Sequence, residues 1–165
     1  MHTGGWYDIF LGGTIRNYLG MKESGANETA RSGQRLVIGP WAHGARGSTM
    51  VGRHYFGIMA DPAATDIDGM HLRWFDHWLN DGKNGITEEA PVRIFVMGDD
   101  VWREEQEWPL ARAQETKYYL HGCGKANSKH GDGSLGTATP NGESPDVFLY
   151  NPADPVPTAG GALCC

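Results

Sequence analysis

The sequence predicts an α/β segment followed by an all-β segment, with the change near residues 82–90. Apolar residues recur at helical spacing over 9–21 and again over 66–79, and a β-branched apolar run lies between them at 34–39. After the change, the expected strands are 92–97, 116–121 and 146–150. The 24 glycines and 9 prolines indicate many turns, which fits a β-rich second half.

The first expected helix starts near Asp8, and Gly12 and Gly13 weaken its first turn. A polar loop over 22–33 separates it from the short strand at 34–39. Gly39-Pro40 closes that strand, because proline rarely continues a central strand.

A long loop is expected over 40–65, after which Asp66 or Asp68 caps a second helix that ends before Gly82. The last six residues, 160–165, are expected to begin another strand. Both ends of the chain are therefore interpreted as cuts within a larger protein.

Charge and hydropathy exclude several partner classes. The net charge is −6 and no run of Lys or Arg exceeds two residues, so we expect neither nucleic acid nor an anionic membrane surface as a partner. No apolar stretch approaches the ~18–20 residues of a transmembrane helix. No signal-peptide pattern follows Met1, and cytoplasmic and secreted localisation both stay open because the N-terminus is expected to be missing.

The three cysteines, Cys123, Cys164 and Cys165, are expected to be free and partly buried thiols. A Cys123–Cys164 disulfide has no support in the sequence. The redox compartment is therefore left open.

Two segments carry candidate catalytic residues. Asp8 follows Gly4-Gly5-Trp6-Tyr7 at the end of an expected strand, and His43 follows Gly39-Pro40-Trp41-Ala42. The order acid then histidine at strand ends is that of the last two members of a Ser–acid–His triad. Spacing alone favours a plainer interpretation, in which the aspartate caps a helix and the histidine is a surface residue.

The literal motifs favour the catalytic interpretation. G-G-W-Y-D and G-P-W-A-H resemble the acid and histidine segments of the cocaine esterase family, relatives of the X-Pro dipeptidyl-peptidases and of glutaryl-acylase-type hydrolases. Later stretches resemble the same family in the same order: P-V-R-I-F-V-M-G from Pro91, Tyr118-Tyr119-Leu120, and Y-N-P-A-D-P-V-P-T from Tyr150.

The resemblance implies an architecture. Residues 1–82 would be the C-terminal portion of an α/β-hydrolase domain, and residues 83–165 the N-terminal portion of a jelly-roll-like β-sandwich, the X-Pro dipeptidyl-peptidase C-terminal domain. Such enzymes are serine hydrolases that act on esters, amides or X-Pro peptides.

The resemblance also implies roles for single residues. Asp8 would be the triad acid and His43 the general base. Phe10 would line the acyl pocket, and Leu163, in the loop 161–163, would approach the pocket mouth. No metal and no organic cofactor are expected, and a homodimer is left open.

The nucleophile is not expected in this chain. A G-x-S-x-G elbow requires glycine two positions before and two positions after the serine, and no serine of this chain meets that requirement. The serines are Ser24, Ser32, Ser48, Ser128, Ser134 and Ser144. We expect the serine and the oxyanion-hole donors in the upstream half of the same enzyme, which is then a required partner. The isolated chain is expected to be inactive.

Alternative interpretations have weaker support. A metal site would draw on His54, Asp61, Asp66, Asp68, His71, Asp76 and His77, but their spacing matches no ligand motif. The G-x-G-x-x-G match at 131–136 lacks the strand and helix that a phosphate loop needs.

Two binding surfaces also stay open. Trp102, Trp108, Tyr118 and Tyr119 could form the platform of a non-catalytic β-sandwich carbohydrate-binding module, although core packing at strand spacing explains them more simply. Trp74, Phe75 and Trp78 could form a partner-binding stripe on the second helix, for which packing against the sheet is the simpler explanation.

Overall fold

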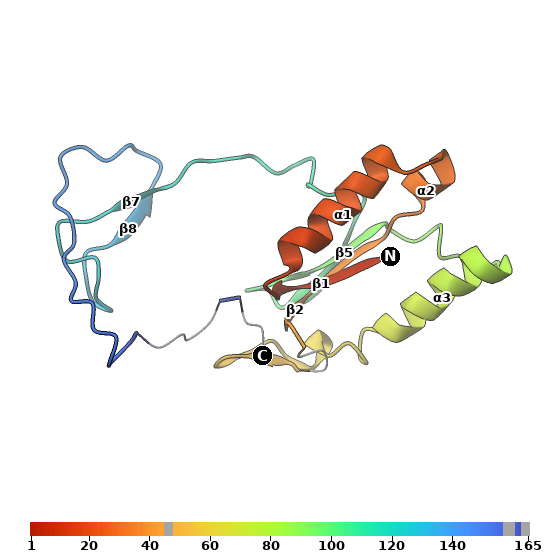
Figure 1. Cartoon of the computed structure of the whole chain (residues 1–165), viewed down its shortest axis with the longest axis horizontal. Helices are drawn as coiled ribbons and strands as arrows, with labels where there is room; N and C mark the ends of the chain where they lie inside the picture. The colour runs from red at the N-terminus through yellow and green to blue at the C-terminus, as the bar shows by residue number, and fades with distance from the viewer. Residues whose placement is uncertain (45–47, 157–160, 163–165) are drawn as a thin grey trace. The chain divides into compact units, whose positions relative to one another are not determined.

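The computed structural model describes residues 1–44, 48–156 and 161–162, which form two compact units (Figure 1). Unit 1 includes Met1–Ala111, and unit 2 begins at Arg112. The elements of unit 1 are β1 (His2–Tyr7), α1 (Leu11–Ser24), α2 (Glu28–Ser32), β2 (Leu36–Ala42), β3 (Met50–Val51), β4 (His54–Tyr55), η1 (Ile58–Ala60), α3 (Ile67–Asn80), β5 (Val92–Val96) and β6 (Val101–Glu105). Unit 2 contains β7 (Tyr119–His121) and β8 (Ser134–Gly136).

The main sheet of unit 1 has the strand order β1-β2-β5-β6. β1, β2 and β5 are parallel, and β6 returns antiparallel to β5. Parallel neighbours require crossover connections, which α1 and α2 supply between β1 and β2, and α3 between β2 and β5. The described strands outside this sheet form two small antiparallel pairs, β3-β4 and β7-β8. The chain is therefore a mixed α/β structure.

Alternating side chains of β2 place the two long helices on opposite faces of the sheet (Figure 1). Leu36 and Ile38 pack with Tyr18 of α1. Val37, between them in sequence, packs with Ile67 of α3. β2 is consequently covered on both faces and reads as a continuous apolar run rather than an alternating one.

Several sequence-based boundaries are corrected. The strand expected at 34–39 spans Leu36–Ala42, so Gly39-Pro40 does not close it; Pro40 lies at an irregularity of the ladder, where proline is tolerated. The strand expected at 146–150 is wrong: these residues have no regular structure and are exposed. The loop expected over 40–65 contains β3, β4 and η1, which are only two or three residues long and therefore too short to show a periodic pattern in the sequence.

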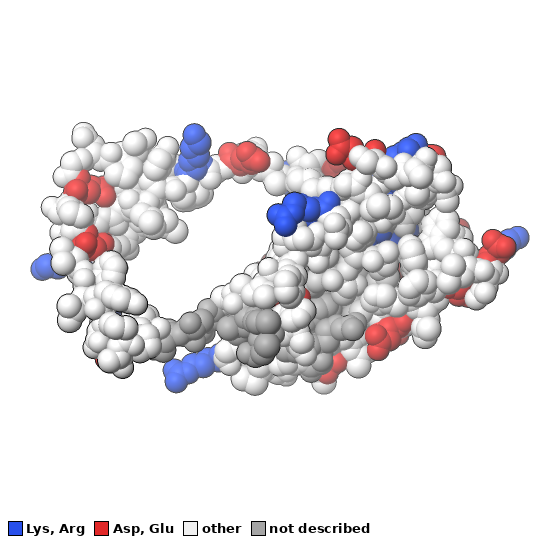
Figure 2. Space-filling view, in the orientation of Figure 1, with Lys and Arg blue, Asp and Glu red and all other residues white. Residues whose placement is uncertain are grey.

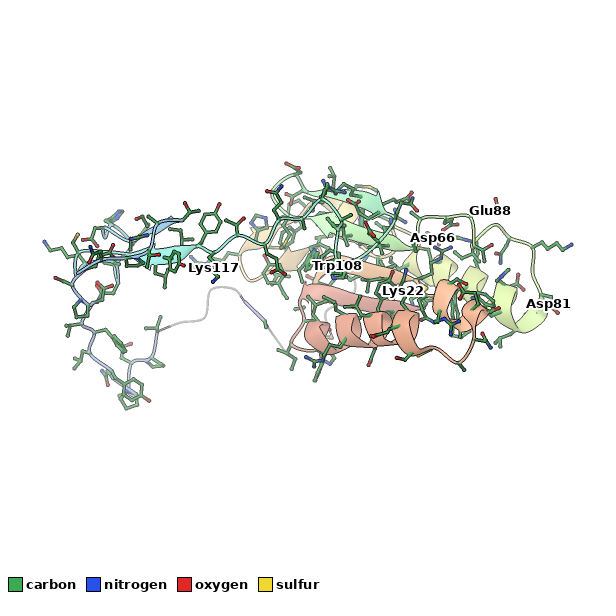
Figure 3. All side chains as sticks on the ribbon, turned by 90° about the horizontal axis from the view of Figure 1, so that it is seen from above. Lys22, Asp66, Asp81, Glu88, Trp108 and Lys117 are labelled. Atoms are coloured by element: carbon green, nitrogen blue, oxygen red, sulfur yellow. The ribbon has the colours of Figure 1, made fainter. Side chains whose placement is uncertain are left out.

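The start of α3 also differs from expectation. Asp66 precedes the helix, but it has a left-handed backbone (φ 52°) and its side chain makes no capping hydrogen bond. Its carboxylate instead contacts Arg73 at 3.1 Å. Asp66 and Asp81, labelled in Figure 3, mark the two ends of this helix.

Leu36 supplies a test of this core. It has no exposed surface, so Leu36→Ala should lower the free energy of unfolding by about 2–5 kcal/mol through lost burial and the cavity left behind. Urea unfolding followed by tryptophan fluorescence measures unit 1 selectively, because all 6 tryptophans lie within it. Leu72→Ala, at a position 71% exposed, is the control and should change it by less than about 0.5 kcal/mol. Equal effects of the two substitutions would contradict the assigned core.

Candidate functional site

The candidate site lies where β1 and β2 end. Asp8 directly follows β1 and His43 directly follows β2. Parallel neighbours present their carboxyl ends at the same edge of a sheet, so residues 35 positions apart in sequence come together there. The Nδ1 atom of His43 lies 3.2 Å from Oδ2 of Asp8.

A tight backbone turn holds Asp8. Its own N–H donates to the carbonyl of Gly5 at 3.0 Å, and its carbonyl accepts from Leu11 N–H at 3.1 Å. Its carboxylate atom Oδ1 accepts the N–H of Phe10 at 2.7 Å. One carboxylate oxygen is thus bound by the chain itself, and the other is directed to the imidazole of His43.

The carboxylate determines which nitrogen of His43 donates. Because an ionised carboxylate only accepts hydrogen bonds, Nδ1 carries the proton in this contact and Nε2 is left as an acceptor. The Asp8 side chain is 18% exposed and that of His43 is 44% exposed, so the acid is the more enclosed member. The pair can orient an imidazole whose free nitrogen takes a proton from a substrate or nucleophile.

Phe10 completes this corner of the site. Its ring meets the imidazole of His43 edge-on, with centroids 4.7 Å apart, and it is 56% exposed. The structure therefore places Phe10 beside the pair, with about half of its surface exposed. Leu163, the other expected substrate contact, lies outside the described residues.

An open cavity of about 620 Å³ adjoins the pair. Its lining residues are Met1, Thr3, Gly4, Gly5, Asp8, Trp41, Ala42, His43, Gly44 and His71. His71 Nδ1–H donates to the carbonyl of Ile67 at 2.8 Å, and the Nε2 atom of the same ring lies 3.3 Å from Thr3 Oγ1. Gly5 and Trp41 belong to the two sequence motifs, but the sequence did not predict that they line this cavity. Their position in the cavity depends on contact between the two strands, which a local sequence pattern does not show.

The residues of the sequence-based metal hypothesis have other contacts. Asp66 binds Arg73, Asp76 accepts from Asn84 at 3.3 Å, and His77 Nδ1 contacts the carbonyl of Gly82 at 2.9 Å. Within residues 1–44, 48–156 and 161–162, no three His, Cys, Asp or Glu side chains gather in a group able to hold a metal ion.

Two aromatics of the carbohydrate hypothesis pack into unit 1. The indole N–H of Trp102 donates to the carbonyl of Met59 at 2.7 Å, and its ring contacts Trp41 and Phe95. Trp108, labelled in Figure 3, packs against the cluster between α1 and the sheet. Both indole rings therefore contribute to packing within unit 1.

The surface charge of unit 1 and the hydropathy of the helices bear on possible partner sites. Lysine and arginine are interspersed with acidic residues over the visible face of unit 1 and form no single basic patch there (Figure 2). None of the described helices is long and apolar enough to cross a membrane.

Unit 2 has a second carboxylate–imidazole pair. His121 Nδ1 lies 2.6 Å from Oε1 of Glu143, whose Oε2 accepts the N–H of Gly122 at 3.0 Å. The hydrogen bond from His121, followed by that from Gly122, lowers the pKa of Glu143 below its ordinary value. Cys123, beside this pair in sequence, forms no disulfide with a described residue and is exposed rather than partly buried as expected, whereas Cys164 and Cys165 lie outside the described residues.

Comparison with known proteins gives a consistent set of relatives. Residues 84–162 match the family model of the X-Pro dipeptidyl-peptidase C-terminal non-catalytic domain. Cocaine esterase of Rhodococcus sp. (strain MB1 Bresler) is 40% identical over 164 residues, which cover 98% of this chain and 27% of the relative. A candidate serine esterase of Mycobacterium bovis (strain ATCC BAA-935 / AF2122/97) is 31% identical over 130 residues, 70% of this chain and 19% of the relative.

A solved structure shares the fold. The crystal structure of an aminopeptidase from the marine sediment archaeon Thaumarchaeota archaeon superposes with a TM-score of 0.60 at 25% identity, over 94% of this chain and 23% of that one. The chain thus spans about a quarter or less of the length of these relatives.

The pair in unit 2 predicts a pH dependence. A carboxyl whose pKa is lowered by folding stabilises the folded state above its ordinary pKa, and this contribution is lost as the pH falls through the lowered value. His121→Ala removes the main cause, so the NMR titration midpoint of the Glu143 carboxyl should rise. His130→Ala, an exposed histidine of the same unit, should leave it unchanged. An identical midpoint in the parent and in His121→Ala would refute the assigned contact.

Proposed function

This chain belongs to the cocaine esterase / X-Pro dipeptidyl-peptidase C-terminal domain family, and from that premise we propose that it supplies the acid and the general base of a serine hydrolase. Asp8 is the acid and His43 is the base. The observation that carries the proposal is the 3.2 Å contact between His43 Nδ1 and Asp8 Oδ2 at the carboxyl ends of adjacent parallel strands.

The proposed reaction is a two-step acyl transfer. His43 Nε2 takes the proton of a serine hydroxyl as the serine oxygen attacks the substrate carbonyl carbon. The bond from that carbon to the leaving group then breaks, and His43 returns the proton to the leaving oxygen or nitrogen. Water, deprotonated by the same histidine, releases the acid and regenerates the serine. Asp8 fixes the imidazole orientation and stabilises its cation in both steps.

The serine belongs to a part of the enzyme outside these 165 residues. None of the serines in this sequence lies in a G-x-S-x-G elbow, and the chain covers 27% of the Rhodococcus relative. We place the oxyanion-hole donors there as well. The complete hydrolase, rather than this chain by itself, is the active species.

The domain assignment follows the same relationship. We assign residues 1–82 to the end of an α/β-hydrolase domain and residues 83–165 to the opening of a jelly-roll-like β domain. The family match from residue 84 supports this division. β5 and β6 open the matched region: β5 pairs with β2 and β6 pairs with β5, so both strands extend the sheet of unit 1 before the chain continues into unit 2.

Esters are the substrate class that we propose first. Two relatives are esterases by name, whereas the aminopeptidase shares 25% identity. The exposed ring of Phe10 offers an apolar surface beside His43 for the acyl or alcohol group. Amide and X-Pro peptide substrates are the alternatives within the same chemistry.

Substitution of the pair tests the proposal in the complete hydrolase. Asp8→Asn removes the acceptor for His43 Nδ1–H, and His43→Ala removes the base. Each should lower kcat for a p-nitrophenyl ester by roughly 10³-fold or more.

Matched controls are Asp68→Asn, in the first turn of α3, and His130→Ala, in unit 2. Both positions are exposed, and both variants should keep kcat within about twofold. A loss of only a few-fold in Asp8→Asn or His43→Ala would remove that residue from the triad.

A further inference from the structure

The junction of β1 and β2 beside the candidate site contains an extra residue. Gly5 aligns with Gly39, and Tyr7 aligns with Ala42. Two steps along β1 therefore correspond to three steps along β2, which is the arrangement of a β-bulge. The irregular stretch of β2 ends directly before His43, and a bulge at that point re-aims the residue that follows it.

Gly5 makes this close approach possible. A Cβ atom at position 5 would overlap the carbonyl oxygen of Trp41 and crowd its carbonyl carbon. Both are backbone atoms, so no side-chain rotation could relieve the overlap. Gly5 is not among the positive-φ residues, so space between the strands, rather than backbone conformation, requires glycine here.

Trp41 anchors the opposite side of the junction. Its side chain is 2% exposed and packs with Val37, Ile67 and Met70. Its indole N–H donates a hydrogen bond of 2.6 Å to the carbonyl oxygen of the buried residue Ala60. A Cβ at Gly39 would lie 2.5 Å from the indole ring, so this second glycine leaves the space that the ring occupies.

We propose that Gly5 and Trp41 are positioning residues that determine the distance between the side chains of His43 and Asp8. Asp8 lies three positions after Gly5, and His43 lies two positions after Trp41. We therefore expect that a larger separation between Gly5 and the Trp41 carbonyl lengthens the 3.2 Å contact between His43 Nδ1 and Asp8 Oδ2. This inference rests on the proposed function, and both residues act through the Asp8–His43 pair.

Gly5→Ala in the complete hydrolase is the primary test. A misplacement of about 1 Å costs on the order of 10²-fold, so kcat should fall about 10²-fold while KM stays within about threefold. A crystal structure of the variant should show the His43 Nδ1 to Asp8 Oδ2 distance lengthened beyond hydrogen-bonding range. An unchanged kcat with an unchanged distance overturns the proposal.

A glycine of α1 supplies the matched control. A Cβ at Gly13 would meet nothing within 4 Å, and Gly13 does not line the cavity. Gly13→Ala should therefore keep the kcat of the parent. Should Gly5→Ala fail to fold, Trp41→Phe replaces it: this variant keeps an aromatic ring but loses the hydrogen bond to Ala60, and kcat should fall about 10-fold.

A double-mutant cycle separates positioning from any other role. If Gly5 acts through the pair, Gly5→Ala should cost nothing further in the Asp8→Asn background. If the fold-losses in kcat of the two single variants multiply in the double variant, the proposal is overturned, because Gly5 would then act independently of the pair. Full activity of Asp8→Asn alone would instead refute the triad, and the Asp8–His43 distance in the Gly5→Ala crystal structure would still decide the positioning role.

Discussion

The parallel pairing of β1 with β2 is the constraint on which the candidate site depends. Parallel strands end at the same edge of a sheet, so this pairing brings Asp8 and His43 together across 35 positions of sequence. The pairing itself requires a crossover, and α1 supplies it by packing Tyr18 against Leu36 and Ile38. The same apolar residues that stabilise the sheet therefore determine where the carboxylate and the imidazole meet.

The Asp8–His43 pair contributes little to stability but has a well-defined geometry. An exposed ion pair contributes about 0–1 kcal/mol to folding, and the His43 side chain is 44% exposed. Nevertheless, Asp8 is held by three local hydrogen bonds of the turn, from or to Gly5, Phe10 and Leu11. Such fixed orientation is what the proposed proton transfer would require, since catalysis depends on preorganised geometry.

The family match and the compact units divide the chain at different places, and strand pairing explains the difference. The matched region begins at residue 84, whereas unit 1 extends to Ala111. β5 pairs with β2 from Leu36 to Ile38, and without it the buried strand β2 would have unpaired backbone groups on that side. The first strands of the matched region thus complete a sheet begun by the preceding residues.

The sequence by itself determined the α/β character of the first part, the strand expected at 92–97 and observed as Val92–Val96, and the two segments that end in Asp8 and His43. These features depend on local periodicity and literal motifs. It misplaced the end of β2, missed β6 and β8, and placed a strand at 146–150 where none exists. Only the tertiary structure revealed the overlap that Gly5 avoids with Trp41 and the anchoring of Trp41 on Ala60. These features depend on distances between segments far apart in the chain, and local side-chain patterns carry no information about such distances.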